Sequence, residues 1–280
     1  MSLENRIDAL LPQEMAEKAE TAGVRKAALS FLPLFALAIL AGAFIGLGAM
    51  FATTTAAASS TLPYGVARLL IGLAFCLGLI LVVVGGAELF TGNNLIVMAW
   101  ASRKISTWAL LRNWLVVYVG NFVGSLGTAL LVFFGKQYAA GGGSVGEAAL
   151  KIAVGKVNLG FVQALALGIL CNCLVCLAVW LTFSARSVAD KILAIIFPIS
   201  GFVAAGFEHS VANMYFIPYT LLIKAFDPGF VTAKAIDLSS LTWGAFFLKN
   251  LLPVTLGNII GGAMLVAAMY WFIYLRKRNN

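Results

Sequence analysis

The sequence predicts an all-α polytopic membrane protein, and three observations lead to that prediction. Hydrophobic residues make up 61% of the 280 residues and charged residues only 11%, which is more apolar surface than a soluble domain of this length can bury. The apolar runs are continuous, whereas a transmembrane β-barrel would alternate at a period of two. The basic residues behind the net charge of +8 cluster at the ends of these runs, as in the cytoplasmic loops of membrane proteins, so we expect no nucleic-acid partner.

Residues 1–27 precede the first apolar run and are expected to form an amphipathic cytoplasmic segment. Five acidic groups and the lack of a long apolar core distinguish this segment from a secretory signal. Pro12 is expected to open a short helix that ends near Gly23. Such a segment would lie on the membrane surface or under the mouth of a pore. Before Pro12, four apolar residues also follow helical spacing: Leu3, Ile7, Leu10 and Leu11.

Six apolar runs follow, and four of them have the length of a single transmembrane helix. These four are roughly Ala28–Thr53, Trp108–Gly135, Asn158–Phe183 and Phe246–Leu275. The other two, Pro63–Ala101 and Ser187–Ala225, would each extend about 58 Å as one straight helix, far beyond the ~30 Å apolar core of a bilayer. Each is therefore either one broken crossing or two separate crossings.

The distribution of basic residues favours six spans, of which the second and fifth are broken. With both termini inside, the inner side carries Arg6, Lys18, Arg25, Lys26, Arg103, Lys104, Arg112, Arg186, Lys191, Arg276, Lys277 and Arg278. The outer side then carries only Arg68, Lys136, Lys151, Lys156, Lys224, Lys234 and Lys249. Splitting both long runs into two crossings would make the two sides nearly equal, against the positive-inside rule.

The six spans fall into two repeats within a single transmembrane domain of residues 28–280. The repeats cover about residues 28–135 and 158–275, and the sequence 120–124 in the third span resembles 257–261 in the sixth. Because each repeat holds three spans, the two repeats cross the membrane in opposite directions. The sequence therefore predicts inverted repeats.

Both broken spans contain the same polar interruption. Gly, Glu and Asn recur at identical spacing, as Gly86, Glu88 and Asn93 in the first copy and as Gly206, Glu208 and Asn213 in the second. Because a carboxylate is energetically costly at membrane depth, each of these two glutamates is a candidate functional residue. A duplicated break in two hydrophobic segments also points to a transport site between two repeats.

The second interruption contains His209, the only histidine of the chain and its strongest functional candidate. A neutral imidazole can hydrogen-bond a carboxylate, and a protonated one can neutralise it. Thr91, in the first interruption, has a hydroxyl that can donate to His209 or to a substrate. Structural alternatives stay open for both residues, because the histidine can tie the broken backbone together and the threonine can cap the resumed helix.

Six further residues have ordinary structural interpretations on the sequence alone: Phe75, Leu79, Phe202, Lys156, Asn172 and Asn258. The three apolar residues have the spacing of packing residues. The lysine marks a helix end or concentrates anions, and the two asparagines can hydrogen-bond a neighbouring helix.

We expect no metal site and no cofactor. Cys171 and Cys173 point to different faces of a helix, and apart from Cys176 and one histidine there is no second group of ligands. The glycine runs 141–143 and 261–262 lack the Lys-Ser/Thr pair that would hold a phosphate.

Three segments resemble the formate–nitrite transporter family: GAELFTGNN in the second span, GFEHSVANMY in the fifth and LGNIIGG in the sixth. The resemblance extends over essentially the whole chain and is strongest to the bacterial members that conduct formate. It implies an aquaporin-like six-helix protomer, a homopentamer in the bilayer of the bacterial inner membrane, and both termini in the cytoplasm. It also implies a channel for formate and related small monovalent anions, with a pore in each protomer and pH-dependent gating.

The resemblance also assigns roles to individual residues. His209 becomes the central residue of the pore, and Thr91 becomes its partner near mid-membrane. Leu79 with Phe75 or Phe202 would narrow the pore on either side of the histidine, since hydrophobic constrictions exclude hydrated ions. Four more residues are placed at or near the pathway: Leu89, Lys156, Asn172 and Asn258.

Carboxylates exposed in such a pathway would repel formate, so we expect Glu88 and Glu208 to be structural. They would accept backbone N–H groups freed at the breaks or bond polar side chains of the other repeat. We expect the same structural role at the breaks for four more residues: Asn93, Asn213, Gly86 and Gly206.

Other functions stay open. A proton-coupled secondary transporter of formate or nitrite would use the same histidine to carry a proton. A water or glycerol pore lacks support because neither break has an Asn-Pro-Ala motif. An enzyme is the weakest hypothesis, because there is no nucleophile–base constellation.

Overall fold

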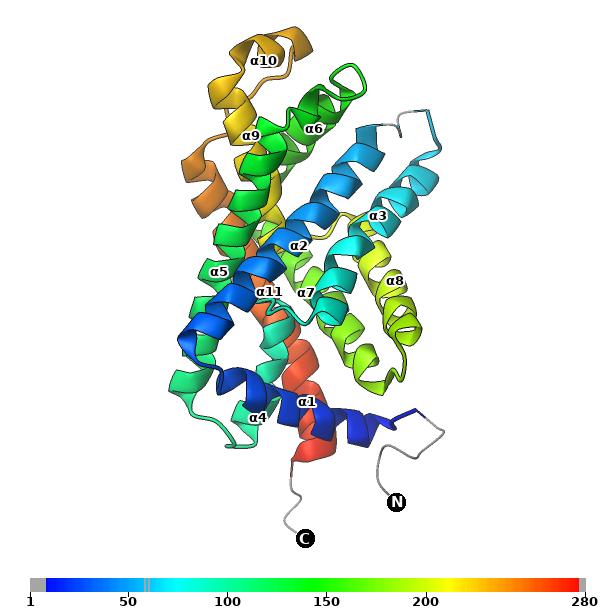
Figure 1. The fold of residues 1–280 in the computed structure, drawn as a ribbon, viewed down its shortest axis with the longest axis vertical. Coiled ribbons are helices and arrows are strands. Elements are labelled where there is room, and N and C mark those ends of the chain that lie inside the picture. The colour runs from blue at the N-terminus through cyan, green and yellow to red at the C-terminus, as the bar shows by residue number, and fades with distance from the viewer. Residues whose placement is uncertain (1–8, 58, 60, 277–280) are drawn as a thin grey trace.

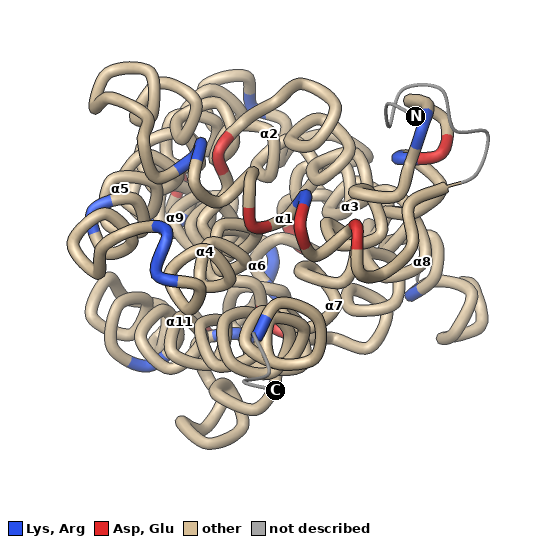
Figure 2. Tube along the Cα trace, turned by 90° about the horizontal axis from the view of Figure 1, so that it is seen from below, with Lys and Arg blue, Asp and Glu red and all other residues tan. Residues whose placement is uncertain are grey.

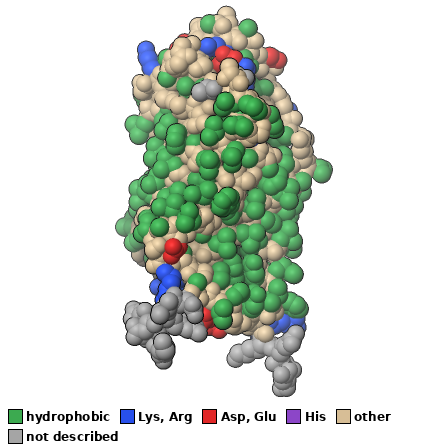
Figure 3. All heavy atoms as spheres, turned by 90° about the vertical axis from the view of Figure 1, so that its right-hand side faces the viewer, with side chains coloured by type: hydrophobic (Ala, Val, Ile, Leu, Met, Phe, Trp, Pro, Cys, Tyr) green, Lys and Arg blue, Asp and Glu red, His purple; other side chains and the backbone are tan. Residues whose placement is uncertain are grey.

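The computed structural model describes residues 9–57, 59 and 61–276, and all secondary structure in these residues is helical. Six helices are long and apolar enough to cross a membrane. Figure 3 shows the matching surface, a broad apolar belt with charged side chains gathered at the two ends. The all-α, six-span prediction is confirmed. The expected helical spacing of Leu3 and Ile7 falls outside the described residues.

The helices form two halves of similar construction (Figure 1). The first half contains α1 (Pro12–Ala27), α2 (Phe31–Ala57), α3 (Tyr64–Gly85), η2 (Gly92–Ile96), α4 (Val97–Ala101) and α5 (Thr107–Phe134). The second contains α6 (Ser144–Val157), α7 (Phe161–Ser184), α8 (Val188–Ala205), α9 (Ser210–Phe226) and a last span built from η4 (Ala245–Leu251), α11 (Leu252–Ile259), η5 (Ile260–Ala268) and η6 (Trp271–Leu275). Two short elements, η3 (Gln137–Ala139) and α10 (Pro228–Lys234), lie in connections.

The two halves are inverted relative to each other. Each begins with a helix that lies at one end of the bundle, and α1 and α6 lie at opposite ends (Figure 1). Within the first half α2 packs on α5, within the second α7 packs on α11, and α3 packs on α8 between the halves. The predicted inverted repeat is therefore confirmed, and each half includes an additional short helix before its first span.

Helix α1 crosses one end of the bundle, and Figure 2 shows it from that end with charged residues along its length. Pro12 occupies the first turn as expected, and the Glu14 carboxylate accepts the Leu11 N–H at 2.9 Å. The helix continues to Ala27, beyond the predicted end at Gly23, because Gly23 is buried in close contact with α4. The face of α1 that contains Ala16 and Ala19 is buried against η2 and α4.

Both predicted breaks are present, and each begins at a glycine. Helix α3 ends at Gly85 and helix α8 at Ala205, and the following residues, Gly86 and Gly206, have φ angles of 78° and 77°. This left-handed conformation is a common helix C-cap that only glycine adopts without strain. The second and fifth spans are therefore single crossings interrupted at corresponding points.

Close packing of α2 on α5 depends on Gly124. A Cβ atom at this position would overlap the carbonyl oxygen of Ile39, whereas a Cβ at Gly127 on the same helix would meet nothing within 4 Å. We expect Gly124→Ala to lower the free energy of unfolding by about 1–3 kcal/mol, because the helices must separate. Thermal unfolding in detergent measures the effect, with Gly127→Ala as the matched control. Equal losses in the two variants would contradict this explanation.

Candidate functional site

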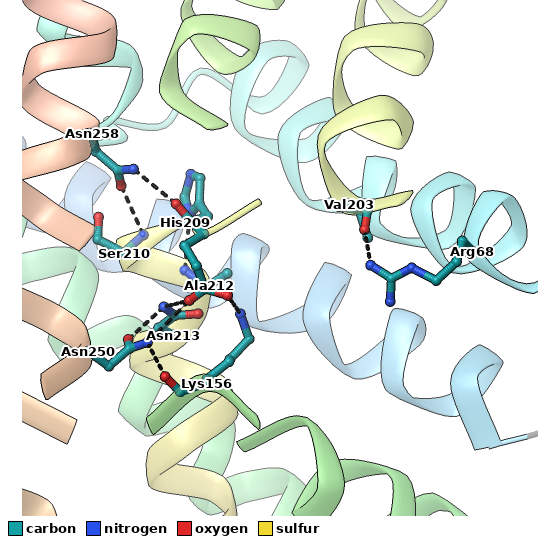
Figure 4. A network of polar contacts seen from close by, with 10 residues as sticks. Arg68, Lys156, Val203, His209, Ser210, Ala212, Asn213, Asn250 and Asn258 are labelled. Carbon is teal, nitrogen blue, oxygen red and sulfur yellow. Dashed lines mark hydrogen bonds and ion pairs between the residues drawn. The ribbon is translucent and has the colours of Figure 1, made fainter. Parts of the chain in front are cut away.

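The two breaks meet at a contact between Thr91 and His209. The Thr91 hydroxyl lies 3.0 Å from His209 Nε2, and both residues are buried. His209 is also the N-cap of α9, because its Nδ1 accepts the Ala212 N–H at 3.0 Å (Figure 4). A ring nitrogen that accepts a hydrogen bond carries no proton, so these contacts assign the proton of the neutral ring to Nε2. The ring therefore presents its N–H on the side of Thr91.

Aromatic and aliphatic side chains from the second and fifth spans surround this pair. The rings of Phe202 and His209 stack with their centroids 6.0 Å apart, and Phe75 meets Phe202 edge-on at 5.6 Å. Leu79 and Leu89 are buried as well. The structure thus brings together residues that lie far apart in the sequence.

Two cavities approach this pair from opposite sides. The α1-side vestibule, about 340 Å³ in volume, is lined by residues of α1, α3 and the first break, including Leu79 and Leu89. The α6-side vestibule, about 270 Å³, is lined by residues of α3, α6, α8 and the second break, including Phe75, Phe202 and His209. His209 thus lines the α6-side vestibule, whereas Gly92, next to Thr91 in the sequence, lines the α1-side vestibule.

Glu88 belongs to a buried polar cluster, here called the first cluster, with Lys26, Asn93 and Asn113. Lys26 Nζ lies 2.8 Å from one Glu88 oxygen, and the Asn93 amide donates to the other at 2.8 Å. The same Asn93 amide donates to Asn113 Oδ1 at 2.9 Å, and Asn113 donates to the Lys26 carbonyl at 3.1 Å. The Glu88 charge is therefore neutralised by a lysine of α1.

Glu208 belongs to an equivalent second cluster with Lys156, Asn213 and Asn250 (Figure 4). Lys156 Nζ lies 2.7 Å from one Glu208 oxygen, and Asn213 donates to the other at 2.7 Å. Asn213 also donates to Asn250 Oδ1 at 2.7 Å, and Asn250 donates to the Lys156 carbonyl at 3.0 Å. Lys156 thus lies in the last turn of α6, as the helix-end interpretation expects, and its ion pair with Glu208 means that it is not a free cation.

The freed backbone groups are bonded by asparagines instead of glutamates. Asn121 Oδ1 accepts the Phe90 N–H at 2.9 Å, and its amide donates to the carbonyls of Ala38 and Glu88. In the second half, Asn258 Oδ1 accepts the Ser210 N–H at 2.9 Å, and its amide donates to the carbonyls of Gly168 and Glu208. The partners of the glutamate side chains therefore differ from those expected, since they are lysines and asparagines of the same half.

Arg68 and Asn172 belong to neither break, but each donates hydrogen bonds to backbone carbonyls at or next to one. Arg68 donates to the carbonyls of Ala204 and Val203 at the end of α8 (Figure 4). The Asn172 amide donates to the Asn258 carbonyl at 2.7 Å and to the Thr91 carbonyl at 3.3 Å. Asn172 thus holds the backbone of the residue that contacts His209.

Five side chains of these networks were not predicted as site residues: Lys26, Arg68, Asn113, Asn121 and Asn250. A signal for the asparagines was present, because Asn113 precedes Asn121 by eight residues just as Asn250 precedes Asn258. Lys26 had no comparable signal, since it lies outside the apolar runs.

Comparisons with known proteins agree with this architecture. A family model described as formate/nitrite transporter matches residues 13–272. The formate channel FocA of Escherichia coli (strain K12) is 47% identical over 284 residues, which cover 100% of both chains. The solved structure of a pentameric formate channel with formate bound is 47% identical and covers 88% of this chain and 98% of that one, with a TM-score of 0.82. An FNT family ion channel, 29% identical, covers 93% and 98% with a TM-score of 0.77. Because the family model matches most of the chain, this protein belongs to the formate/nitrite transporter family.

Proposed function

We propose that this protein is a transmembrane channel that passes formate and related small monovalent anions through a pore in each protomer of a homopentamer. The observation that carries the proposal is the buried contact between Thr91 and His209, which lies between two vestibules of opposite orientation. The full-length similarity to a formate channel and to a pentameric formate channel with formate bound supports the choice of substrate and of assembly.

The charge of formate makes the centre of the membrane the costly part of its path. His209 Nε2–H and the Thr91 hydroxyl would lower this cost, because both can donate hydrogen bonds to a carboxylate that replaces their mutual contact. His209 is the N-cap of α9, so the positive end of the helix dipole also faces this point. A small anion is therefore stabilised where its own hydration is lost.

Selectivity would come from the apolar side chains on either side of the pair. Leu79 and Leu89 on one side and Phe75 and Phe202 on the other offer no groups that replace the hydration shell of an inorganic cation. The two nearby glutamates would not repel formate, because each is paired with a lysine.

The proposal extends to the membrane and to pH. We expect a multi-pass protein of the bacterial inner membrane with both termini in the cytoplasm. The contact between Gln13 and the Tyr274 carbonyl supports termini on one side. We also expect pH-dependent gating, as in the family that the chain resembles. Helix α1 forms part of the vestibule wall, and the ion pairs Lys26–Glu88 and Lys104–Glu20 join it to the first break and to the segment after α4.

Formate flux into proteoliposomes tests the proposal and its alternative, a proton-coupled transporter. We expect rapid equilibration of formate down its gradient, without accumulation beyond equilibrium when a pH gradient is imposed. Coupling would require His209 to take up a second proton, which would break its bond to the Ala212 N–H. Concentrative uptake driven by the pH gradient would decide for the transporter. Absence of formate flux in vesicles that contain folded protein would contradict both.

A further inference from the structure

The α1-side vestibule has lysines without acidic partners. Its lining includes Lys18 and Lys26 of α1, Lys191 of α8, and a single carboxylate, that of Glu88. Lys26 is paired with Glu88, and Lys18 donates to the backbone carbonyl of Phe183 at 2.8 Å. Within the described part of the chain, neither Lys18 nor Lys191 has a carboxylate within 4.0 Å.

These lysines are close enough to repel each other. The pKa of Lys18 is lowered from its usual value, first by burial and then by the positive charges of Lys191 and Arg25. The folded protein therefore holds like charges together at this mouth, and no carboxylate of the described residues is paired with Lys18 or Lys191. A bound anion would relieve that repulsion.

The α6-side vestibule has fewer cations without a carboxylate partner. Lys151 and Lys156 are paired with Glu147 and Glu208, and only Arg68 is bonded to backbone carbonyls alone, those that end α8. The two vestibules occupy equivalent positions in the inverted repeat, but more positive charge is left without a carboxylate on the α1 side.

We propose that the α1-side vestibule binds a small oxyanion with two or more negative charges between Lys18 and Lys191, and that this anion blocks the pore from that side. A multivalent anion can bridge lysines on two different helices, whereas a monovalent one compensates only one of them. The cavity of about 340 Å³ is large enough for such an anion. Leu79 and Leu89 belong to the apolar part of its lining, and a strongly hydrated multivalent anion cannot pass such an apolar constriction.

Calorimetry on the detergent-solubilised full-length protein tests the binding, with pyrophosphate and succinate as probes. Binding of pyrophosphate alone would identify the ligand as a phosphate compound, and binding of both would identify any multivalent oxyanion, including dicarboxylates. The double variant Lys18→Gln/Lys191→Gln is expected to weaken binding by at least about tenfold. The control Arg276→Gln removes one positive charge just after η6, which packs on α1, outside the vestibule lining, and should bind normally. Failure of both probes to bind, or equal binding to the double variant, would overturn the proposal.

Sided inhibition tests the block, which rests on the proposed channel function. Pyrophosphate is added to one side of proteoliposomes at a time, and orientation is assigned from protease access to an N-terminal tag. We expect inhibition of formate flux at a concentration at least about tenfold lower on the α1 side. Equal inhibition from both sides would overturn the block. Binding that depends on the lysines in protein without any formate flux would contradict the channel and leave the binding site standing.

Discussion

Replacement of His209 by phenylalanine is expected to reduce formate flux by on the order of tenfold to a hundredfold and to change its pH dependence. The side chain supplies a buried N–H at the point where the two vestibules approach each other. A hydrogen bond to a charged group contributes about 1.5–3 kcal/mol, which corresponds to that range of rates. Stopped-flow uptake of formate by proteoliposomes at several pH values measures the change.

A second variant separates transport from folding. His209 caps α9 through its Nδ1, so the phenylalanine variant also loses about 1 kcal/mol of stability. His209→Asn keeps an acceptor that can cap the helix but shortens the side chain away from Thr91. We expect its unfolding temperature to stay near that of the wild type while its flux falls like that of the phenylalanine variant. Wild-type flux and pH profile in both variants would remove the histidine from the mechanism.

Replacement of Lys156 by methionine is expected to lower the free energy of unfolding by about 3–5 kcal/mol, because it leaves the Glu208 carboxylate buried without its cation. Asn213 and Asn250 would still donate to the carboxylate, but neutral donors do not balance its charge. Thermal or denaturant unfolding of the detergent-solubilised protein measures the loss.

The inverted repeat and a double variant provide matched controls for this prediction. Lys156→Met/Glu208→Gln removes both charges and should recover most of the lost stability. Lys26→Met, in the first cluster, should cost less, because the Lys26 side chain is 35% exposed and the Lys156 side chain 15%. Additive losses in the double variant would show that the two charges are not coupled.

The positions of the two breaks were predictable from local sequence. Unbroken apolar runs give the spans, and the excess length of two of them requires an interruption. Gly86 and Gly206 mark the points where a left-handed residue ends each helix. The pairing of Thr91 with His209 came from the resemblance, because no periodicity relates residues on two separate broken helices.

The partners of the glutamates were not predictable in the same way. Lys26 and Lys156 lie in short helices outside the apolar runs, and hydrophobic patterning does not specify where such helices lie. The backbone groups freed at each break include both donors and acceptors. An asparagine amide satisfies both, whereas a carboxylate only accepts. This explains why Asn121 and Asn258, and not the glutamates, bond the broken backbone.

The two polar clusters also bear on how the chain is made. Every partner of Glu88 described above comes from the first half, and every partner of Glu208 comes from the second. Each half can therefore neutralise its own carboxylate as soon as its last span has been synthesised, without waiting for the other half. The contacts of Thr91 with His209 and Asn172, like those of Arg68 with the end of α8, need both halves together. During biosynthesis, the transport pathway is then the last part to form, when two units with no unpaired buried charge come together in the bilayer.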